Sequence, residues 1–270
     1  MTSPHDRGAD DQHDPSARKD TLRVDLGGRR ALVTGGTRGI GAATAALLRS
    51  AGAQVVVSAR SDPGGNPSPV LVADLSTAAG VERLADQTLA ALGGVDILVS
   101  NVGGQVRRPG ALDFTEQDWQ QELSINLLAA VRLDRALAPH MVAQRAGVIV
   151  HVSSGAARVA RPSSLPYSAA KAALNAYSKG LASDLGRHGV RVNTVSPGLI
   201  ETSRMAEVAA ERGVEPSAML AQVAASLEIP LGRAGTAEEV AQLILFLASP
   251  AASYLTGSHY VVDGGAFPVT

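Results

Sequence analysis

A tyrosine and a lysine four residues apart, Tyr167 and Lys171, are the side chains best suited to acid–base chemistry. They lie in an Ala- and Leu-rich run over 165–187 that predicts a helix, so they share one helix face. An ammonium beside a phenol favours phenolate and is expected to lower the tyrosine pKa. With 4 Tyr and three Lys in the chain, this spacing should arise by chance about 0.04 times. The alternative is an exposed pair without a chemical role.

Two further polar residues follow apolar runs that read as strands. Ser154 comes just after 148–152, and Asn101 ends the run 95–100. In open α/β sheets, ligands bind outside the carboxyl ends of the strands. A hydroxyl at this edge can donate a hydrogen bond to a carbonyl oxygen that gains negative charge during a reaction.

A glycine-rich turn separates the first predicted strand from the first predicted helix. Thr34 begins the segment TGGTRGIG, in which Gly35, Gly39 and Gly41 are spaced as G-x-x-x-G-x-G. Glycines allow a tight turn and close approach to a pyrophosphate, and the N-terminus of the following helix favours an anion. The spacing differs from the usual G-x-G-x-x-G, so a plain tight turn is the alternative reading.

The elements that must position these residues alternate between short β-rich runs and helical ones, which predicts a single-domain α/β fold with a seven-stranded, mostly parallel, doubly wound sheet flanked by helices. Strands are expected at 31–34, 55–58, 70–73, 95–100, 148–152, 190–195 and 259–262. Helices are expected at 39–51, 77–92, 115–142, 165–187 and 236–248.

Two segments fall outside this alternation. Residues 60–69 are too rich in Pro and Gly for a helix, so the crossover between the second and third strands should be an irregular loop. Residues 1–24 are polar and are expected to form a disordered tail, which leaves 25–270 as the folded domain.

Composition excludes several classes of protein. A net charge of −1 over 270 residues argues against a nucleic-acid partner. With 0 Cys there is no disulfide framework, and none of the 6 His has metal-ligand spacing, so no metal site is expected. No apolar run is long enough to span a membrane, and the N-terminus lacks a signal sequence, so a cytoplasmic protein is expected.

These motifs together resemble the short-chain dehydrogenase/reductase family, in particular members similar to 3-oxoacyl-(acyl carrier protein) reductases. The glycine turn, Asn101-x-Gly103, Asn126, and Ser154 followed by Tyr167-x-x-x-Lys171 match the family in order and spacing. The resemblance covers about residues 27–266 and implies a Rossmann-type fold.

The resemblance also implies roles for these residues. Tyr167 would be the general acid or base, Ser154 would polarise the substrate carbonyl, and Lys171 would lower the tyrosine pKa and hold the nicotinamide ribose. Asn126 would hold a water that links Lys171 to solvent, unless it is only a helix-kinking or solvent-facing Asn. The implied cofactor-binding residues are Gly35, Thr37, Arg38, Gly39, Ile40, Gly41, Arg60, Asp74, Leu75, Asn101, Gly103, Tyr167, Lys171, Pro197, Gly198, Ile200 and Thr202.

Two arginines favour NADP(H) over NAD(H). NAD enzymes of this fold place an acidic residue after the second strand, whereas NADP enzymes offer Arg to the 2′-phosphate. Here Arg60 ends the second predicted strand, and Arg38 lies in the glycine turn. Asp62 could turn toward the ribose instead, so NAD(H) stays open.

The leading hypothesis is therefore an NADP(H)-dependent reductase of a ketone, or a secondary-alcohol dehydrogenase, with a 3-oxoacyl or polyketide-like substrate as a candidate. The alternatives are a lyase, dehydratase or epimerase without net cofactor consumption, and an NADPH-sensing protein. Residues 203–228 are expected to form a mobile substrate lid. Four arginines could rim the pocket and favour an anionic substrate, or could simply be solvated: Arg107, Arg108, Arg158 and Arg161. The helices at 115–142 and 165–187 resemble those that pair family members into homotetramers or homodimers.

Overall fold

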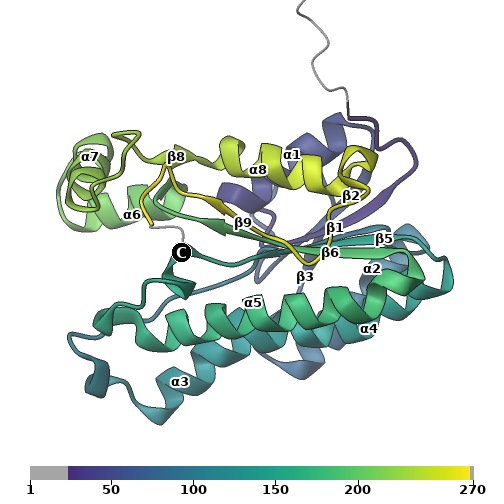
Figure 1. Cartoon of the computed structure of the whole chain (residues 1–270), viewed down its shortest axis with the longest axis horizontal. Coiled ribbons are helices and arrows are strands. Elements are labelled where there is room, and N and C mark those ends of the chain that lie inside the picture. The colour runs from purple at the N-terminus through teal and green to yellow at the C-terminus, as the bar shows by residue number, and fades with distance from the viewer. Residues whose placement is uncertain (1–23, 268–270) are drawn as a thin grey trace, which may run out of the picture.

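A seven-stranded parallel sheet lies at the centre of the molecule (Figure 1). The structure is a computed structural model that describes residues 24–267. Apart from Val24, the tail expected at 1–24 lies outside this range. The strand order is β3-β2-β1-β4-β5-β6-β9, and each neighbouring pair is parallel. The strands are β1 (Arg30–Thr34), β2 (Gln54–Ala59), β3 (Val70–Val72), β4 (Ile97–Ser100), β5 (Gly147–Val152), β6 (Val190–Pro197) and β9 (His259–Val262).

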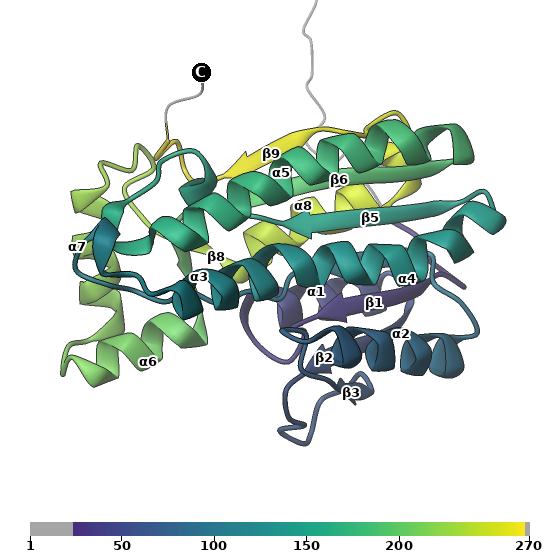
Figure 2. The same cartoon turned by 90° about the horizontal axis from the view of Figure 1, so that it is seen from below.

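Helices cover both faces of this sheet, which confirms the doubly wound prediction. One face packs against α1 (Gly39–Ser50) and α8 (Ala237–Ala248). The other face packs against α2 (Ala78–Leu92), α4 (Ala129–Ala143) and α5 (Leu165–Leu185), which lie side by side in Figure 2. Because strand side chains alternate between faces, Leu32 and Val33 of β1 enter opposite hydrophobic cores.

The crossover between β2 and β3 is an irregular loop, as predicted. It runs from the end of β2 at Ala59 to Val70 without a helix. The Arg49 guanidinium of α1 donates a hydrogen bond of 3.1 Å to the Ser68 hydroxyl, and Ser68 is buried. This hydrogen bond ties the loop to the helix layer.

The helix expected at 115–142 is interrupted. It consists of α3 (Glu116–Leu123), a π-helical turn (Ser124–Leu128) and α4. The Thr115 hydroxyl accepts a hydrogen bond from the Asp118 backbone N–H and caps the start of α3. A π turn holds one extra residue, and such turns occur frequently at functional sites. Here the turn contains Asn126.

A small subdomain lies beyond the carboxyl ends of the strands (Figure 1). The expected lid at 203–228 contains two helices, α6 (Ser203–Glu211) and α7 (Pro216–Ser226). A two-stranded sheet that the sequence did not predict, β7 (Ile200–Glu201) and β8 (Gly235–Thr236), forms its base.

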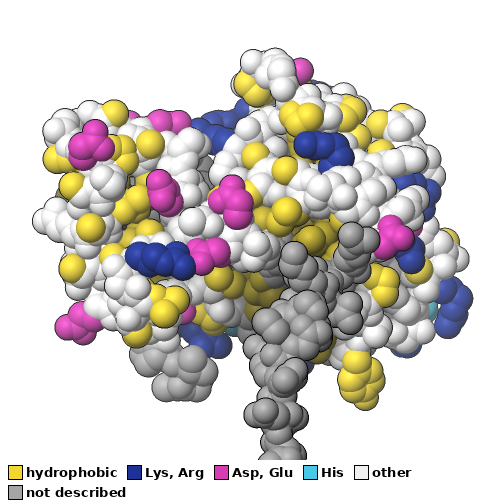
Figure 3. All heavy atoms as spheres, turned by 90° about the horizontal axis from the view of Figure 1, so that it is seen from above, with side chains coloured by type: hydrophobic (Ala, Val, Ile, Leu, Met, Phe, Trp, Pro, Cys, Tyr) yellow, Lys and Arg dark blue, Asp and Glu magenta, His cyan; other side chains and the backbone are white. Residues whose placement is uncertain are grey.

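The surface on the α1 and α8 side carries charges of both signs. Figure 3 shows acidic, basic and hydrophobic side chains interspersed there, without one continuous basic field on this face. This distribution matches the net charge of −1.

Candidate active site

The predicted catalytic side chains converge at the carboxyl edge of the sheet. Ser154 lies just beyond the end of β5, after Ser153, and its hydroxyl accepts a hydrogen bond of 3.2 Å from the Ala156 N–H. Tyr167 and Lys171 lie in the first two turns of α5. The Lys171 Nζ lies 6.0 Å from the centre of the Tyr167 ring, and Ser154 is near enough to Tyr167 to act on the pKa of its phenol.

Lys171 is almost completely buried and is fixed by the backbone. Its Nζ donates a hydrogen bond of 2.8 Å to the Val152 carbonyl oxygen at the end of β5. The Ser153 hydroxyl donates to the Lys171 carbonyl oxygen at 3.2 Å. These two bonds hold the start of α5 against the end of β5.

Burial is the largest influence on the pKa values of Tyr167 and Lys171. It lowers the pKa of Lys171 to about 8, against the opposing charge of Glu122. It also raises the pKa of Tyr167, although hydrogen bonding with Ser154 acts in the other direction. The pKa of Tyr167 is thus raised on balance in this structure and not lowered as expected, because removing the phenolate from water costs more than the nearby groups return.

Asn126 is held from three sides within the π turn. Its amide nitrogen donates to the Gly104 carbonyl oxygen at 2.9 Å and to the Glu122 backbone carbonyl oxygen at 3.1 Å. Its Oδ1 accepts from the Gly104 N–H at 3.2 Å. One lone pair of Oδ1 is left for a further donor. Asn126 is buried, so it does not face solvent, which excludes that alternative reading of the residue.

The glycine turn packs so tightly that side chains would not fit. A Cβ on Gly41 would lie 2.2 Å from the Gly35 carbonyl oxygen, and Gly35 itself has a φ of 63°. Asn101 braces the turn, since its Nδ2 donates to the Thr34 carbonyl oxygen at 2.9 Å. The Thr34 hydroxyl accepts from the Asn101 N–H at 2.9 Å in return. These two bonds hold the glycine turn against the end of β4.

The N-terminus of α1 is open to an anion. Arg38 occupies the N-cap position and makes no side-chain cap, so the first N–H groups of α1 point toward the turn. The Arg38 guanidinium is exposed and donates to Glu207 of α6 at 3.3 Å.

Arg60 follows the neighbouring strand β2. The pKa of Asp74 is lowered mainly by hydrogen bonds from Ser76, and the charge of Arg60 contributes to a smaller extent. Asp62, the alternative ribose ligand, instead accepts a hydrogen bond of 2.9 Å from the Gly64 N–H within its own loop.

The other predicted cofactor residues lie along the same edge. Thr202 begins α6, and its Cγ2 lies 3.4 Å from where a Cβ on Gly39 would stand. Gly198 follows β6, and a Cβ there would collide with Asp263. Partly or fully buried positions around them are Thr37, Ile40, Leu75, Pro197 and Ile200.

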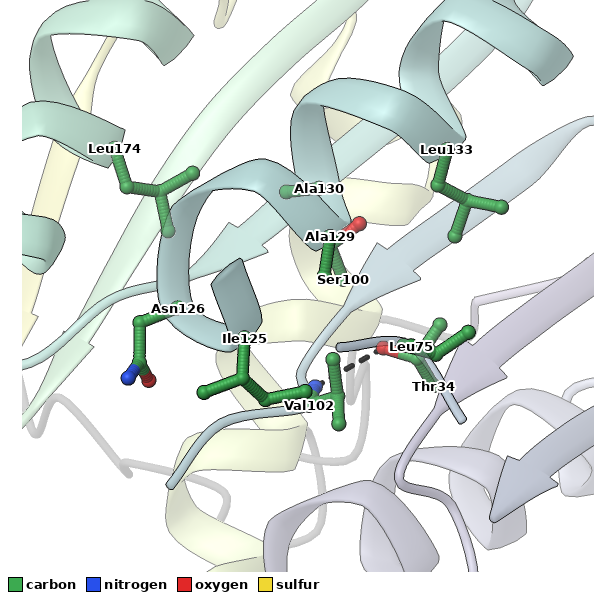
Figure 4. Close-up of a pocket in the computed structure, with 10 residues that line it drawn as sticks. All are labelled: Thr34, Leu75, Ser100, Val102, Ile125, Asn126, Ala129, Ala130, Leu133 and Leu174. Carbon is green, nitrogen blue, oxygen red and sulfur yellow. Dashed lines mark hydrogen bonds between the residues drawn. The ribbon is translucent and has the colours of Figure 1, made fainter. Parts of the chain in front are cut away.

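A small cavity lies between the end of β1 and the π turn (Figure 4). Thr34 at the end of β1, Ser100 at the end of β4 and Asn126 supply its polar lining. The Ser100 Oγ is buried and has no hydrogen-bond partner among the described residues. The remaining lining is apolar: Leu75, Val102, Ile125, Ala129, Ala130, Leu133 and Leu174.

Two residues of the site were missed by the sequence reasoning. Glu122 of α3 is buried, and its Oε2 accepts a hydrogen bond of 2.8 Å from Asn126 Nδ2. Its spacing of four from Asn126 on a predicted helix was the available signal. Phe267 packs on Gly155, where a Cβ would come within 2.0 Å of the ring, and so covers the turn beside Ser154. No local sequence pattern predicts the contact between Phe267 and Gly155.

Within residues 24–267, no group of three or more His, Cys, Asp or Glu side chains is arranged to hold a metal ion. Over the same range, no helix combines the length and the apolar character needed to cross a membrane.

Known proteins with similar sequences and structures are oxidoreductases. A family model described as enoyl-(acyl carrier protein) reductase matches residues 35–266. A 3-oxoacyl-[acyl-carrier-protein] reductase of Vibrio cholerae is 35% identical over 255 residues, which cover 91% of this chain and 100% of that protein. Gluconate 5-dehydrogenase of Gluconobacter oxydans is 35% identical over 251 residues, covering 89% and 95% of the two chains.

Among solved structures, the L-sorbose reductase of Gluconobacter frateurii, in complex with NADPH and L-sorbose, superimposes with a TM-score of 0.84 at 32% identity, covering 92% of this chain and 100% of that one. The matches run through the glycine turn, the Ser154–Tyr167–Lys171 cluster and the carboxyl edge of the sheet that brings them together. The chain belongs to the short-chain dehydrogenase/reductase family of oxidoreductases.

Proposed function

We propose that this protein is an NADP(H)-dependent reductase of ketones, or a dehydrogenase of secondary alcohols, in which Tyr167 is the general acid or base. The observation that carries the proposal is the convergence of Ser154, Tyr167 and Lys171 beside a glycine turn that opens α1. Because burial raises the Tyr167 pKa, the phenol keeps its proton at neutral pH, which suits an acid in the reductive direction.

Each residue has a distinct task in this proposal. The Ser154 hydroxyl donates a hydrogen bond to the substrate oxygen and orients it. Tyr167 donates its proton to that oxygen as negative charge develops. The Lys171 cation lies close enough to stabilise the tyrosinate that is left behind. Asn126 offers the free lone pair of Oδ1 to a water that returns a proton.

The glycine turn and its neighbours fit a dinucleotide. Because Gly41 has no side chain, the turn can close tightly at the start of α1, and the open N-terminus of α1 favours the charge of a pyrophosphate. Arg38 at the N-cap of α1 and Arg60 just after β2 supply cations for a 2′-phosphate, and the similar L-sorbose reductase was solved in complex with NADPH. When bound, the dinucleotide supplies or accepts the hydride.

The test is NADPH consumption at about 340 nm with a panel of ketones, 3-oxoacyl thioesters, quinones and keto sugars, with NADH in parallel. We expect stereoselective reduction of at least one member, with a kcat/KM for NADPH about tenfold or more above that for NADH. Tight NADPH binding without oxidation by any member would favour a lyase, an epimerase or a sensor.

We propose a 3-oxoacyl thioester of an anionic carrier, or another anionic ketone, as the substrate class. Arg107 lies close enough to Tyr167 for its charge to act on the phenol, and it is exposed. Arg158, just beyond Ser154, is also exposed. Arg108 is not available in the same way, because it forms an ion pair of 2.7 Å with Asp118. The similarity to 3-oxoacyl-(acyl carrier protein) reductases points in the same direction.

Replacing both Arg107 and Arg158 with alanine is expected to raise the KM of an anionic 3-oxoacyl thioester about tenfold while leaving the KM of a neutral ketone nearly unchanged. The reason is that two cations at the mouth of a site attract an anion selectively. Steady-state kinetics on both substrates measures this, with Arg83→Ala, an exposed position on α2, as the control. Equal losses on both substrates would exclude recognition of the anion.

We further propose that α6 and α7 form the substrate lid over 203–228 and that the enzyme is a cytoplasmic homotetramer or homodimer. Thr202, next to Gly39, connects the lid directly to the glycine turn. The outer surfaces of α4 and α5, which lie side by side in Figure 2, are the faces offered for pairing.

A further inference from the structure

Glu122 is a carboxylate in the interior of the protein, at the end of α3. Its side chain is 1% exposed. Oε1 accepts a hydrogen bond from the Val106 N–H, and Oε2 accepts one of 2.8 Å from Asn126 Nδ2. Burial raises the pKa of Glu122, but both oxygens accept from N–H donors, and these hydrogen bonds and the charge of Lys171 favour the ionised carboxylate.

Asn126, the hydrogen-bond partner of Glu122, borders the same space as Lys171. A Cβ on Gly103 would lie 2.9 Å from Asn126 Oδ1 and 3.5 Å from Lys171 Nζ, so these two polar atoms face the same small space. The space exists because residue 103 has no side chain. The hydrogen bond between Glu122 and Asn126 fixes the direction in which Oδ1 points, since the amide nitrogen must face the carboxylate.

Lys171 is a buried cation whose direct partner is neutral. Its Nζ donates to the Val152 carbonyl oxygen, and in the described part of the chain it makes no direct ion pair. Glu122 is the carboxylate whose charge acts on it, and the same charge acts on Tyr167.

Few other charged groups face this cluster. Asp118, on the same helix, also acts on Glu122, but its own charge is matched by Arg108 of the preceding loop. Arg107, from that loop, acts on Tyr167. Glu122 is thus the anion inside the cluster whose charge reaches both members of the acid–base pair.

We propose that Glu122 is a positioning residue for the acid–base pair: its carboxylate orients Asn126 and serves as the buried counter-ion of Lys171, and it thereby sets the pH at which Tyr167 and Lys171 release their proton. This inference rests on the proposed role of Tyr167 as the acid.

The direction of the effect follows from electrostatics. A negative charge near Lys171 and Tyr167 raises the pKa of both, since it favours the cation and disfavours the phenolate. Removing that charge lets the pair lose its proton at lower pH. The fall of ketone reduction at high pH and the rise of alcohol oxidation with pH should therefore both move to lower pH.

The experiment measures kcat/KM against pH in both directions for three variants. Glu122→Gln and Glu122→Met remove the charge at similar size, and Glu122→Asp keeps it. We expect the first two to move both profiles down by about one pH unit, and Glu122→Asp to move them far less. Glu116→Gln, at the exposed start of α3, is the matched control.

If Glu122 had a purely structural role, Glu122→Gln and Glu122→Met would lower kcat at every pH without shifting the pH profiles. That outcome overturns the proposal. A second measurement needs neither turnover nor a Glu122 variant. In Lys171→Met, loss of the cation should raise the pH at which Glu122 protonates, seen as the infrared band of a buried carboxylic acid.

An unchanged infrared titration would also overturn the proposal. Because it requires no catalysis, it separates failure of this inference from failure of the proposed reaction, which the activity of Tyr167→Phe decides.

Discussion

Replacing Tyr167 with phenylalanine is expected to lower kcat by about a thousandfold while the dissociation constant of NADPH changes by less than about twofold. The substitution removes one hydroxyl, the proposed proton donor, and leaves the partly buried ring that packs near Lys171. Without that proton, the alkoxide formed from the substrate must take one from water, which is a weaker acid and is not positioned for the transfer.

Steady-state kinetics and a fluorescence titration with NADPH measure the two quantities separately. Tyr254→Phe is the matched control, because that tyrosine is 99% exposed and far in sequence from the site. If Tyr167→Phe kept more than about a tenth of the wild-type kcat, the acid–base role of Tyr167 would be refuted.

Replacing Lys171 is expected to reduce both turnover and cofactor affinity. Lys171→Ala removes the cation that would stabilise the tyrosinate and also opens a buried cavity at the start of α5. Lys171→Met removes the charge while filling most of the same volume. We expect each variant to lose about a hundredfold or more in kcat and to bind NADPH several-fold more weakly.

The stability of these variants should separate charge from volume. The Lys171 pKa of about 8 lies below its ordinary value of 10.5, so the unfolded chain binds more protons between these pH values. The contribution of this group to stability is therefore lowest below about pH 8 and rises as the pH approaches 10.5.

At pH 7 the native protein holds a buried ammonium, and Lys171→Met should melt at the same temperature or higher despite its low activity. Lys171→Ala should melt lower because of its cavity. Calorimetry at pH 7 checks both. A Met variant as unstable as the Ala variant would show that the ammonium contributes to folding through its bond to Val152.

Much of the fold follows from local patterns. The strands are continuous apolar runs because the sheet is covered on both faces, and each of the seven predicted runs overlaps an observed strand. The crossover loop at 60–69 was also predictable, since Pro and Gly exclude a helix whatever surrounds them.

The interruption of the helix at 115–142 was not predictable in this way. A π turn depends on bonds made outside the helix, here those of Asn126 with Gly104. The strands β7 and β8 are two residues long each and pair across the lid, so no run of apolar residues signals them.

In the candidate site too, features that depend on local sequence were predictable, and features that depend on the folded structure were not. The sequence alone identified Ser154, Tyr167, Lys171 and the glycine turn, because residue types and short spacings are enough to indicate their chemistry. The direction of the Tyr167 pKa was missed because it depends on how deeply the folded chain buries the phenol. Glu122 was missed because a glutamate in a polar helix usually faces water.

The loop that replaces a helix between β2 and β3 affects how the native state opens. β3 is an edge strand of three residues, and Val72 is 44% exposed. Backbone amides of such an edge should exchange with solvent through local opening rather than global unfolding. Arg60 and Asp74 flank this edge, at the proposed adenosine end of the site. A dinucleotide that binds only the closed edge would therefore stabilise β3 against local opening, in place of the packing that a crossover helix would provide.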